Sequence, residues 1–356
     1  MESFIIDKDR KAIEHASGGK NTLVYDNAGN PSVMVVIPKF NLEDVDPSGT
    51  LGTGTHPAFI VHGKEVPEIM ISKYPNVVVG GRAYSLAHED PANWINFDAS
   101  KAACEAKGRG WHLMSRLEFA AIAQWCHKNG FMPRGNTNTG KAYDAPHEHG
   151  VMGGDGRTLT GSGPVSWNHD NTPYGISNLC GDVWEWNDGM KTIDGKIYAV
   201  GEDGTIMNNF DTQNAYKNLA GFIDTGACYN SIAAGNGNKT YADIGKYNIA
   251  GSVTNKDYTG ESTEEYYAEN TGKIAEIGAA SGFTIPKSIY QLGVALPSSW
   301  SDVDDYSWIR NYGERLPVAG GGWGSGSVAG VFALLVNLRR SGANGGLGFR
   351  SAYIAI

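Results

Sequence analysis

Acidic side chains stand close together at two places in the sequence, and carboxylate oxygens are ligands that calcium prefers. Asp182 and Glu185 lie in the stretch GDVWEW, and Asp302, Asp304 and Asp305 lie in SDVDDYSW. A calcium ion takes about six to eight oxygen ligands, and neither stretch supplies so dense a set. A buried carboxylate that accepts backbone hydrogen bonds, or a solvated turn, explains the same residues. We therefore expect no cofactor and no bound metal, with a structural calcium ion as the alternative.

Histidine and cysteine residues offer a second kind of chemistry. His147 and His149, in HEHG, are spaced like a pair of transition-metal ligands. They lie in a polar stretch without a third ligand nearby, so we expect them to face solvent. The cysteines do not form a C-x-x-C pair or the framework of a small disulfide-rich protein. We expect each of them to be a buried free thiol. They are Cys104, Cys126, Cys180 and Cys228.

The motifs of common enzyme classes are missing from the sequence. It contains no G-x-x-x-x-G-K-[ST] phosphate loop, no H-E-x-x-H zinc motif and no G-x-S-x-G nucleophile elbow. The run GGWGSG at 321–326 is rich in glycine, as a dinucleotide-binding loop is. It does not stand between a strand and a helix with an acidic residue about 20 positions later, as such a loop requires. These absences predict a protein without catalytic residues.

Composition narrows the class of protein further. Hydrophobic residues make up 41% and charged residues 19% of the 356 residues, which is typical of a folded globular protein. The net charge of −9 gives no general attraction to nucleic acid or to an anionic membrane. No apolar run has the length of a membrane span, and MESFIIDKDRKAIEH lacks the pattern of a secretion signal. The 48 glycines exceed the usual share of about 7% and predict many loops.

Local patterns predict which elements position these residues. Short β-branched runs between residues 23 and 79 predict two hairpins, one around Asn-Ala-Gly-Asn-Pro at 27–31 and one around His62-Gly63. The stretch 133–171 lacks periodicity and predicts loops, and a further hairpin is expected in DGKIYAVGEDGTIM. We interpret the polar stretch at about 191–300 as an insertion into a single main domain.

Two helices are expected after the hairpins. The first begins with Asp98 as its N-cap, in NFDASKAACEAKGRG. The second begins at Ser115, which forms an S-x-x-E capping box with Glu118, and Leu117, Ala121 and Trp125 repeat along one of its faces. Both helices would therefore pack an apolar face against the strands.

Three motifs together resemble one family. GWHLMSRLEFAAIAQWC, NLCGDVWEW and the pair GGGW and GFRSA are similar to three elements of formylglycine-generating-enzyme-like domains, in the same order, over 110–352. The resemblance implies an α+β fold of C-type lectin-like type, with two helices, twisted antiparallel sheets and many loops. It implies an N-terminal segment at 1–22, a C-type lectin-like domain at 23–356 and a C-terminal variable region at about 315–356.

The sequence departs from the enzymes of that family. Their reactive cysteine pair lies between the GGSW-like and GFR-like elements, and 320–350 contains no cysteine here. A thiol nucleophile or copper thiolate at that place needs sulfur. We therefore expect no oxidase activity, and a relative of the oxidase with altered chemistry is the alternative.

The C-terminal segment resembles a different branch, the variable proteins of diversity-generating retroelements. The residues GGGWGSGSVAGVFAL at 320–334 and GFRSA at 348–352 are similar to the repeat in which error-prone copying diversifies Asn codons. Such codons never reach Lys, Gln, Glu, Met or Trp, and no Lys, Gln, Glu or Met follows Glu314. A glycine-rich loop that lacks these residues by chance is the alternative.

The resemblance also assigns the positions that vary and what they do. They would form a diversified, non-catalytic surface that binds a ligand or receptor, with Arg339 and Arg340 supplying charge nearby. The ligand-binding positions are Gly322, Gly324, Ser325, Val328, Leu335, Asn337, Leu338, Arg339, Gly342, Asn344, Gly345 and Gly346. The expected partner is a protein or surface-glycan receptor on a target cell, bound through multivalent display. The expected location is a phage or viral tail, or a cell surface, and a structural virion subunit is a further alternative.

Invariant aromatic residues would hold the backbone beneath such a surface. We expect Trp184, Trp186, Trp323 and Phe349 in the core, because large aromatics dominate core burial. We expect Arg350 to be held by backbone carbonyls or a buried carboxylate.

The carboxylate analysis generates a first prediction. Adding a chelator should leave the melting temperature unchanged, because no dense set of calcium ligands is visible in the sequence. Thermal melts with and without EDTA measure this, and a fall of many degrees that added calcium reverses would contradict it.

Overall fold

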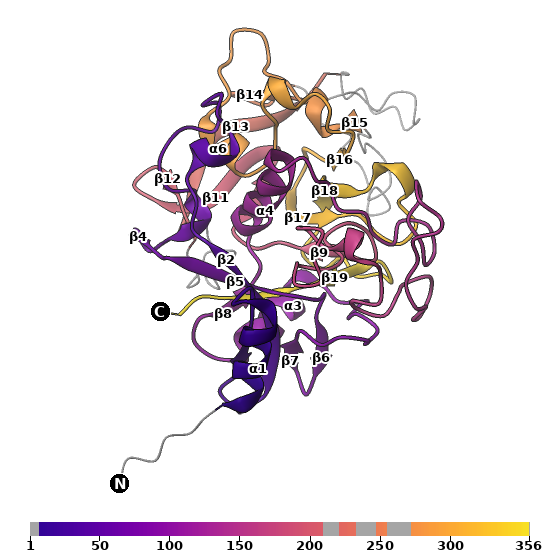
Figure 1. Cartoon of the computed structure of the whole chain (residues 1–356). Coiled ribbons are helices and arrows are strands. Elements are labelled where there is room, and N and C mark those ends of the chain that lie inside the picture. The colour runs from indigo at the N-terminus through magenta and orange to yellow at the C-terminus, as the bar shows by residue number, and fades with distance from the viewer. Residues whose placement is uncertain (1–6, 209–220, 233–246, 255–271, 356) are drawn as a thin grey trace.

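The computed structural model describes residues 7–208, 221–232, 247–254 and 272–355. Its strands form two main sheets around a central helix, and many long loops lie outside them (Figure 1). Helices are few and most strand pairs are antiparallel, so the predicted α+β class is confirmed. None of the helices in the described ranges is both long and apolar enough to cross a membrane.

The first sheet joins the two ends of the described chain. Its order is β1-β2-β5-β20-β8, and every neighbouring pair in it is antiparallel. The strands are β1 (Asn21–Tyr25), β2 (Pro31–Pro38), β5 (Glu68–Ser72), β8 (Trp111–Leu113) and β20 (Ser351–Tyr353). The last strand therefore completes a sheet that begins with the first one, as the yellow and indigo strands of Figure 1 show.

Both predicted N-terminal hairpins are confirmed. β1 and β2 are connected by residues 26–30, and Asp26 accepts hydrogen bonds from the backbone N–H groups of Ala28 and Asn30 at 2.9 and 2.8 Å. His62 and Gly63 both have positive φ and form the second turn, between β3 (Ile60–Val61) and β4 (Lys64–Glu65). A third hairpin pairs β6 (Val77–Val79) with β7 (Arg82–Tyr84).

The second sheet contains the C-terminal segment. Its main path is β14-β13-β11-β10-β17-β18-β16-β15, and β9, β12 and β19 pair onto it. β17 pairs with β18 and β9 in antiparallel fashion, whereas β16 with β18 and β9 with β19 are parallel. The strands are β9 (Trp184–Trp186), β10 (Met190–Ile193), β11 (Lys196–Glu202), β12 (Thr205–Ile206), β13 (Phe222–Ser231), β14 (Tyr247–Ala250), β15 (Gly272–Lys273), β16 (Tyr306–Ile309), β17 (Glu314–Gly320), β18 (Gly330–Leu338) and β19 (Leu347–Phe349).

The described strands of the stretch 191–300 belong to this sheet. β10 pairs with β17 of the C-terminal segment, and β11 continues the sheet outward to β13 and β14. The expected hairpin in DGKIYAVGEDGTIM is present as β11 and β12. The proposed domain boundaries and the status of this stretch as an insertion stay predictions.

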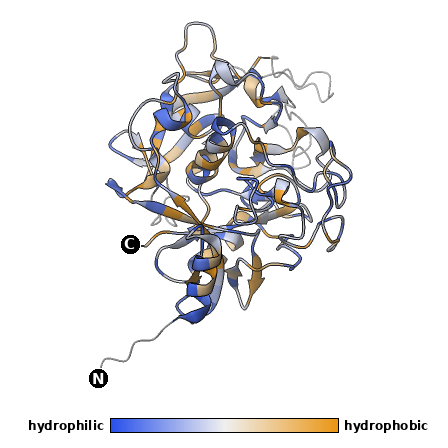
Figure 2. Ribbon diagram, in the orientation of Figure 1, coloured by the Kyte–Doolittle hydropathy of each residue, from blue (hydrophilic) through white to orange (hydrophobic). Residues whose placement is uncertain are grey.

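The second predicted helix is the center of the fold. α4 (Arg116–Lys128) begins at Ser115, whose hydroxyl accepts from the Glu118 backbone N–H, and the Glu118 carboxylate accepts from Ser115 N–H in return. The predicted capping box is therefore confirmed. Residues 116–124 are all buried, and the apolar ones contribute to the largest hydrophobic cluster, which packs between the sheets. Figure 2 shows this helix inside the ring of strands and loops.

The first predicted helix has a different start. α3 (Phe97–Glu105) is capped by Asn96, whose side chain accepts from Ala99 N–H at 2.9 Å, so the prediction of Asp98 as N-cap is wrong. Capping from Asn96 places Phe97 at the first helical position, where it is fully buried against Trp186. A further helix, α1 (Lys8–Ser17), begins after Asp7 and was not expected; α2 (Leu42–Val45) and α6 (Lys287–Gln291) are single turns.

The prediction that four aromatic residues lie in the core is correct for two of them. Trp186 and Phe349 are fully buried, as predicted. Trp184 and Trp323 are only half-buried, so their assignment to the core is wrong. Trp323 lies in a loop with its ring against Gly156, and Trp184 packs edge-on against Trp308 with ring centroids 5.5 Å apart, near the surface.

Arg350 connects the two sheets. Its guanidinium donates to Glu185 Oε2 at 2.6 Å and Oε1 at 2.5 Å, and Glu185 lies on β9. The same group donates to the carbonyl oxygens of Ser72, on β5, and Ser177 at 2.9 and 3.0 Å. Both charged side chains are buried, which confirms that carbonyls and a buried carboxylate hold Arg350.

This pair generates a prediction for stability. Arg350→Met should lower the free energy of unfolding by about 3–5 kcal/mol, because it leaves the Glu185 charge buried without its partner. Urea denaturation measures the change. Asp144→Asn is the matched control, because it breaks an ion pair with Arg134 in which both side chains are more than 40% exposed, and it should cost less than about 1 kcal/mol. Equal effects of the two substitutions would contradict the structural role of Arg350.

Candidate binding surface

Two loops in the C-terminal segment carry most of the predicted ligand-binding positions. Residues 321–329 connect β17 to β18, and residues 339–346 connect β18 to β19. Both loops contact the 133–171 stretch, since Gly326 N–H donates to the Thr137 carbonyl and Arg157 donates to the Gly345 carbonyl. They form the candidate binding surface.

The predicted positions differ in their exposure. Gly324 and Asn344 are exposed, and Gly322 and Asn337 are buried. The others are half-buried; they are Ser325, Val328, Leu335, Leu338, Arg339, Gly342, Gly345 and Gly346. Asn337 has only 3% of its surface exposed because β18 is an inner strand between β16 and β17. The expectation that its side chain projects into solvent is therefore wrong, and Leu335 and Leu338 on the same strand pack partly against a hydrophobic cluster.

Main-chain hydrogen bonds hold the first loop. The Trp323 N–H donates to the Asp182 carbonyl at 2.9 Å, and the Trp323 carbonyl accepts from Thr139 N–H at 2.8 Å. The Gly326 N–H donates to the Thr137 carbonyl at 2.8 Å. These bonds involve only backbone atoms, so they do not depend on which side chains stand at 324, 325 and 328; the Ser325 side chain adds one bond, which it accepts from Gly322 N–H at 2.9 Å.

The second loop is held in the same way. The Asn344 carbonyl accepts from Trp94 N–H at 2.9 Å, and the Gly346 carbonyl accepts from Trp184 N–H at 2.8 Å. The Gly345 carbonyl accepts from Arg157 Nη1 at 3.0 Å, and Arg157 is itself held by two hydrogen bonds to Asp90 at 3.0 Å. These bonds do not depend on the side chains at 344–346, although the Asn344 side chain adds one bond, which it accepts from Gly346 N–H at 2.8 Å.

Arg340 is part of the support for this surface. Its guanidinium lies 3.1 Å from the Asp98 carboxylate and 3.6 Å from that of Glu314, and it packs over the Phe97 ring. Arg339 is half-buried beside it. The expected positive charge is therefore present next to the loops, but that of Arg340 is balanced by two carboxylates.

The glycines of this segment fall into two groups by backbone conformation. Gly320, Gly321 and Gly326 have φ values of 95°, 96° and 60°, a region that L side chains rarely adopt. A Cβ at Gly320 would also lie 2.5 Å from the Leu179 carbonyl oxygen. All three belong to the part of the motif that is expected to stay constant.

The glycines at predicted variable positions behave differently. None of them has φ in that left-handed region; they are Gly322, Gly324, Gly342, Gly345 and Gly346. A Cβ at Gly324 would meet no atom within 4 Å, and Cβ atoms at Gly345 and Gly346 would lie 3.4 Å from the nearest atom. Gly322 and Gly342 are tighter, at 3.2 and 3.1 Å, so a side chain there needs a small shift. The backbone therefore admits side chains where variation is expected.

The first carboxylate cluster, Asp182 and Glu185, lies buried beneath the candidate binding surface. Asp182 is buried with φ of 67°, and Oδ1 accepts from Asn136 Nδ2 and Thr158 N–H at 2.9 and 2.8 Å. Burial raises the pKa of Asp182 to about 6, although these hydrogen bonds oppose the shift. Its neighbor Glu185 pairs with Arg350. The alternative use that the sequence left open, a buried carboxylate that accepts backbone hydrogen bonds, is therefore the one that Asp182 shows.

The carboxylates of the second cluster also interact with other groups of this chain. Asp305 is buried, accepts from Phe332 N–H at 2.7 Å and has its pKa raised to about 7 by burial. Asp302 lies 3.2 Å from His127, and Asp304 lies 2.5 Å from Lys273. Across the described ranges, no three His, Cys, Asp or Glu side chains come together in a way that could hold a metal ion. That folding needs no calcium stays a prediction.

The remaining residues with reactive side chains lie outside the surface. His147 and His149 are exposed, as expected. The four cysteines are buried and unpaired, which confirms the predicted free thiols, and burial raises the pKa of each.

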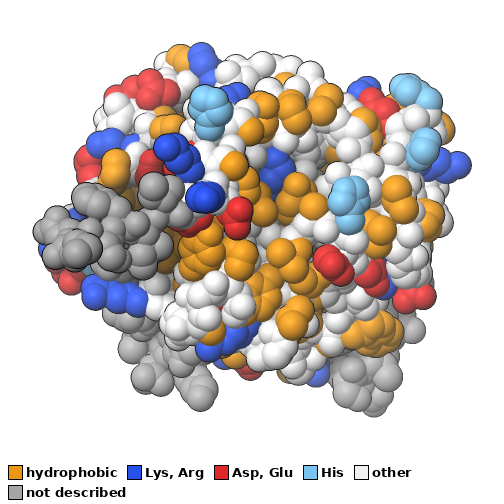
Figure 3. All heavy atoms as spheres, turned by 60° about the horizontal axis from the view of Figure 1, so that its bottom comes forward, with side chains coloured by type: hydrophobic (Ala, Val, Ile, Leu, Met, Phe, Trp, Pro, Cys, Tyr) orange, Lys and Arg blue, Asp and Glu red, His pale blue; other side chains and the backbone are white. Residues whose placement is uncertain are grey.

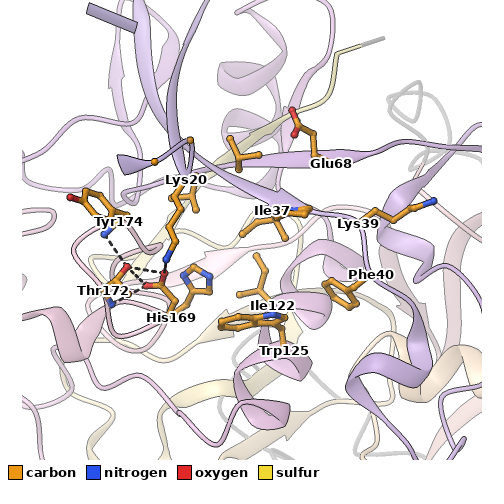
Figure 4. A pocket seen from close by; sticks show the side chains of 16 residues that line it. Lys20, Ile37, Lys39, Phe40, Glu68, Ile122, Trp125, His169, Thr172 and Tyr174 are labelled. Atoms are coloured by element: carbon orange, nitrogen blue, oxygen red, sulfur yellow. Dashed lines mark hydrogen bonds and ion pairs between the residues drawn. The ribbon is translucent and has the colours of Figure 1, made fainter. Parts of the chain in front are cut away.

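A separate pocket of about 700 Å³ lies between β2, α4 and the 169–174 loop. Ile37, Phe40, Ile122 and Trp125 form its apolar lining, as Figure 4 shows. His169 Nδ1 accepts from a backbone N–H at 2.8 Å, and burial lowers the pKa of this histidine to about 4, so the ring is neutral. None of the predicted ligand-binding positions lines this pocket.

Hydrophobic side chains are also exposed elsewhere on the surface. On the face seen in Figure 3 they gather in the middle, with charged side chains around and between them. Several large ones in the described part of the chain are more than half exposed, among them Val79, Trp94 and Val151.

Sequence reasoning missed the residues that hold the loops. Asn136, Thr158, Arg157 and Trp94 are not marked by any motif, and three of them lie in the aperiodic stretch 133–171. The one available signal was the density of Asn, Asp, Thr and Gly there, which favors side chain–backbone hydrogen bonds.

Comparison with known proteins gives matches among solved structures only. No family model matches the sequence, and no curated protein matches it. The structure is similar to PvdO from Pseudomonas aeruginosa, at 13% identity and a TM-score of 0.35, over 93% of this chain and 97% of that one. It is similar to the I1 and U1 variants of the major tropism determinant, at 12% and 13% identity and TM-scores of 0.31 and 0.32. These matches cover 94% and 90% of this chain but only 61% and 62% of those chains.

These structures are of the two kinds that the sequence motifs resemble. PvdO is formylglycine-generating-enzyme-like, and the major tropism determinants are variable proteins of a diversity-generating retroelement in a Bordetella phage, with a C-type lectin fold. At such identities and TM-scores the likeness carries no argument about function, which has to come from the residues of this chain.

The two groups of glycines generate a prediction. Gly324→Ala and Gly326→Ala both place a methyl group where no atom lies within 4 Å, so they differ in φ alone. Gly324→Ala should keep or slightly raise the free energy of unfolding, whereas Gly326→Ala should lower it by about 1–2 kcal/mol. Urea denaturation of the two variants measures the difference. Equal stabilities would contradict the division into permissive and restricted glycines.

Proposed function

We propose that this protein binds a receptor on a target cell through the two C-terminal loops, without catalysis. The observation that carries the proposal is the division of the glycines. The glycines at positions expected to vary have a backbone that other residues can adopt, whereas Gly320, Gly321 and Gly326, which are expected to stay constant, have the left-handed backbone that favors glycine. If the segment only packed against the core, there would be no reason for its left-handed glycines to be separate from the positions expected to vary.

The way the loops are held supports the same function. Hydrogen bonds to their main-chain atoms fix residues 323, 326 and 344–346, and the partners are the backbone of residues outside the segment and, at 345, the Arg157 side chain. A binding surface of this construction is preorganized, so little conformational entropy is lost when a ligand binds. Its side chains can then change to fit different receptors at little cost in stability.

The receptor and its setting are part of the proposal. A protein or a glycan on the cell surface would be bound by many copies at once, on a phage or viral tail or on a cell surface, so that weak single contacts add up. The net charge of −9 does not favor nucleic acid as the partner.

An enzyme related to formylglycine-generating oxidases is the second candidate. The 320–350 segment has no cysteine, and burial raises the pKa of the four that the chain has. A thiolate nucleophile is therefore disfavored at each of them. A copper-dependent oxidation assay that shows turnover would support this candidate instead.

The coding DNA provides the test of the binding function. We predict a reverse transcriptase gene nearby and an imperfect template repeat with Asn codons at the positions expected to vary. Independent isolates should differ at 324, 325 and 344–346, which are exposed or half-buried, and agree at Gly320, Gly321 and Gly326. Sequencing the flanking region and the 3′ end of the gene in many isolates measures this. A gene without a template repeat, identical in all isolates, would favor a structural virion subunit.

A further inference from the structure

Trp94 is a large apolar side chain that the fold leaves in solvent. It is 67% exposed, more than any other large hydrophobic side chain that the structure describes. Its backbone is left-handed, with φ of 52°. A bulky residue in that conformation costs on the order of 1–3 kcal/mol. The indole of Trp94 therefore adds little to stability by burial, and the backbone conformation of Trp94 is strained; strained residues of this kind cluster at ligand-binding sites.

The side chain stands beside the second loop of the candidate binding surface. Trp94 N–H donates to the Asn344 carbonyl at 2.9 Å, and a Cβ at Gly345 would lie 3.4 Å from the indole Nε1. Trp94 itself lies about 220 residues before the segment that is expected to vary. It is therefore a constant residue in contact with a variable loop.

The backbone around Trp94 is held in place. Ala92 N–H donates to the Asn76 carbonyl at 2.9 Å, and the Ala92 carbonyl lies against Gly348. Arg157 connects Asp90 to the Gly345 carbonyl, so the loop that carries Trp94 and the loop at 339–346 share one support. An exposed aromatic ring on a rigid base loses little entropy when it is buried by a partner.

The chemistry around the ring favors a protein partner over a glycan. Both carboxylate oxygens of Asp90 accept from Arg157 at 3.0 Å, and the Asn344 side chain accepts from Gly346 N–H at 2.8 Å. The Asp90 carboxylate and the Asn344 Oδ1 thus have partners within the protein and are not free acceptors for sugar hydroxyls, and the exposed Asn344 side-chain N–H2 group is the donor that remains beside the indole. An isolated exposed tryptophan is the type of residue that dominates protein–protein binding energy.

We propose that Trp94 is a constant anchor of the binding surface, which inserts into an apolar site on a folded protein receptor. The proposal rests on the binding function proposed above. The residue at 345 packs against the edge of the indole when it carries a side chain, so variation there sets how much of the ring is available. The diversified loops would then select the receptor around an anchor that does not change.

The test uses binders made from the full chain. Positions 324, 325 and 344–346 are randomized with NNY codons and displayed, and clones are selected in parallel against lysozyme, a folded protein, and dextran, a polysaccharide. Trp94→Asn is then introduced into independent clones, because Asn is well tolerated with positive φ and removes only the indole. His88→Asn is the matched control: His88 is also exposed with positive φ, of 61°, and its N–H donates to Thr160.

Trp94→Asn should weaken lysozyme binding at least tenfold in most clones, whereas His88→Asn should change it less than twofold. Both variants should keep or raise the melting temperature, because Asn relieves the left-handed backbone. Lysozyme binders that are unaffected by Trp94→Asn would overturn the anchor and leave the binding function standing. A loss confined to dextran binders would overturn the choice of a protein partner. A library that yields no binders would count against the binding function itself, and against the anchor that rests on it.

Discussion

The buried pair of Arg350 and Glu185 is the interaction on which the rest of the structure depends. Arg350 stands between β19 and β20, at the point where the chain leaves the second sheet and enters the first. Its guanidinium contacts β9, the end of β5 and the 177–178 backbone at once. Because a buried charge is costly without its partner, this arrangement favors a relative position of the sheets that keeps the pair together. The loop at 339–346 ends four residues before Arg350, so the pair also fixes where that end of the loop lies.

The sequence predicted a structural element correctly where the residues of one short stretch determine it. The capping box at Ser115, the turns at 26–30 and 62–63, and the buried role of Arg350 could all be predicted. The start of α3 could not, because Asn96 and Asp98 are both good caps and the burial of Phe97 against Trp186 decides between them. Trp323 is half-buried in a loop against Gly156, and Trp184 is half-buried against Trp308; the motifs do not describe these contacts.

Contacts between distant parts of the chain also determine the candidate binding surface, and the sequence did not reveal them. The variable positions were assigned from resemblance to a repeat, and the structure leaves Gly324 and Asn344 exposed but buries Asn337 on β18. The residues that hold the loops, such as Asn136, Arg157 and Asp182, come from distant and aperiodic stretches. Their roles arise only when the chain is folded, because each donates to or accepts from a backbone group far along the sequence. Side-chain identity alone could not reveal them.

The place of β20 has a consequence for the synthesis of the protein. β20 lies between β5 and β8, so the first sheet has a gap until the ribosome has released residues 351–353. A frameshift anywhere in the preceding segment would leave that gap open, and Met70 and Ile71 of β5 would lack their pairing partners. Only copies translated in the correct reading frame to this strand can complete the sheet. Completion of the first sheet would therefore report that the residues before β20 have been translated in frame.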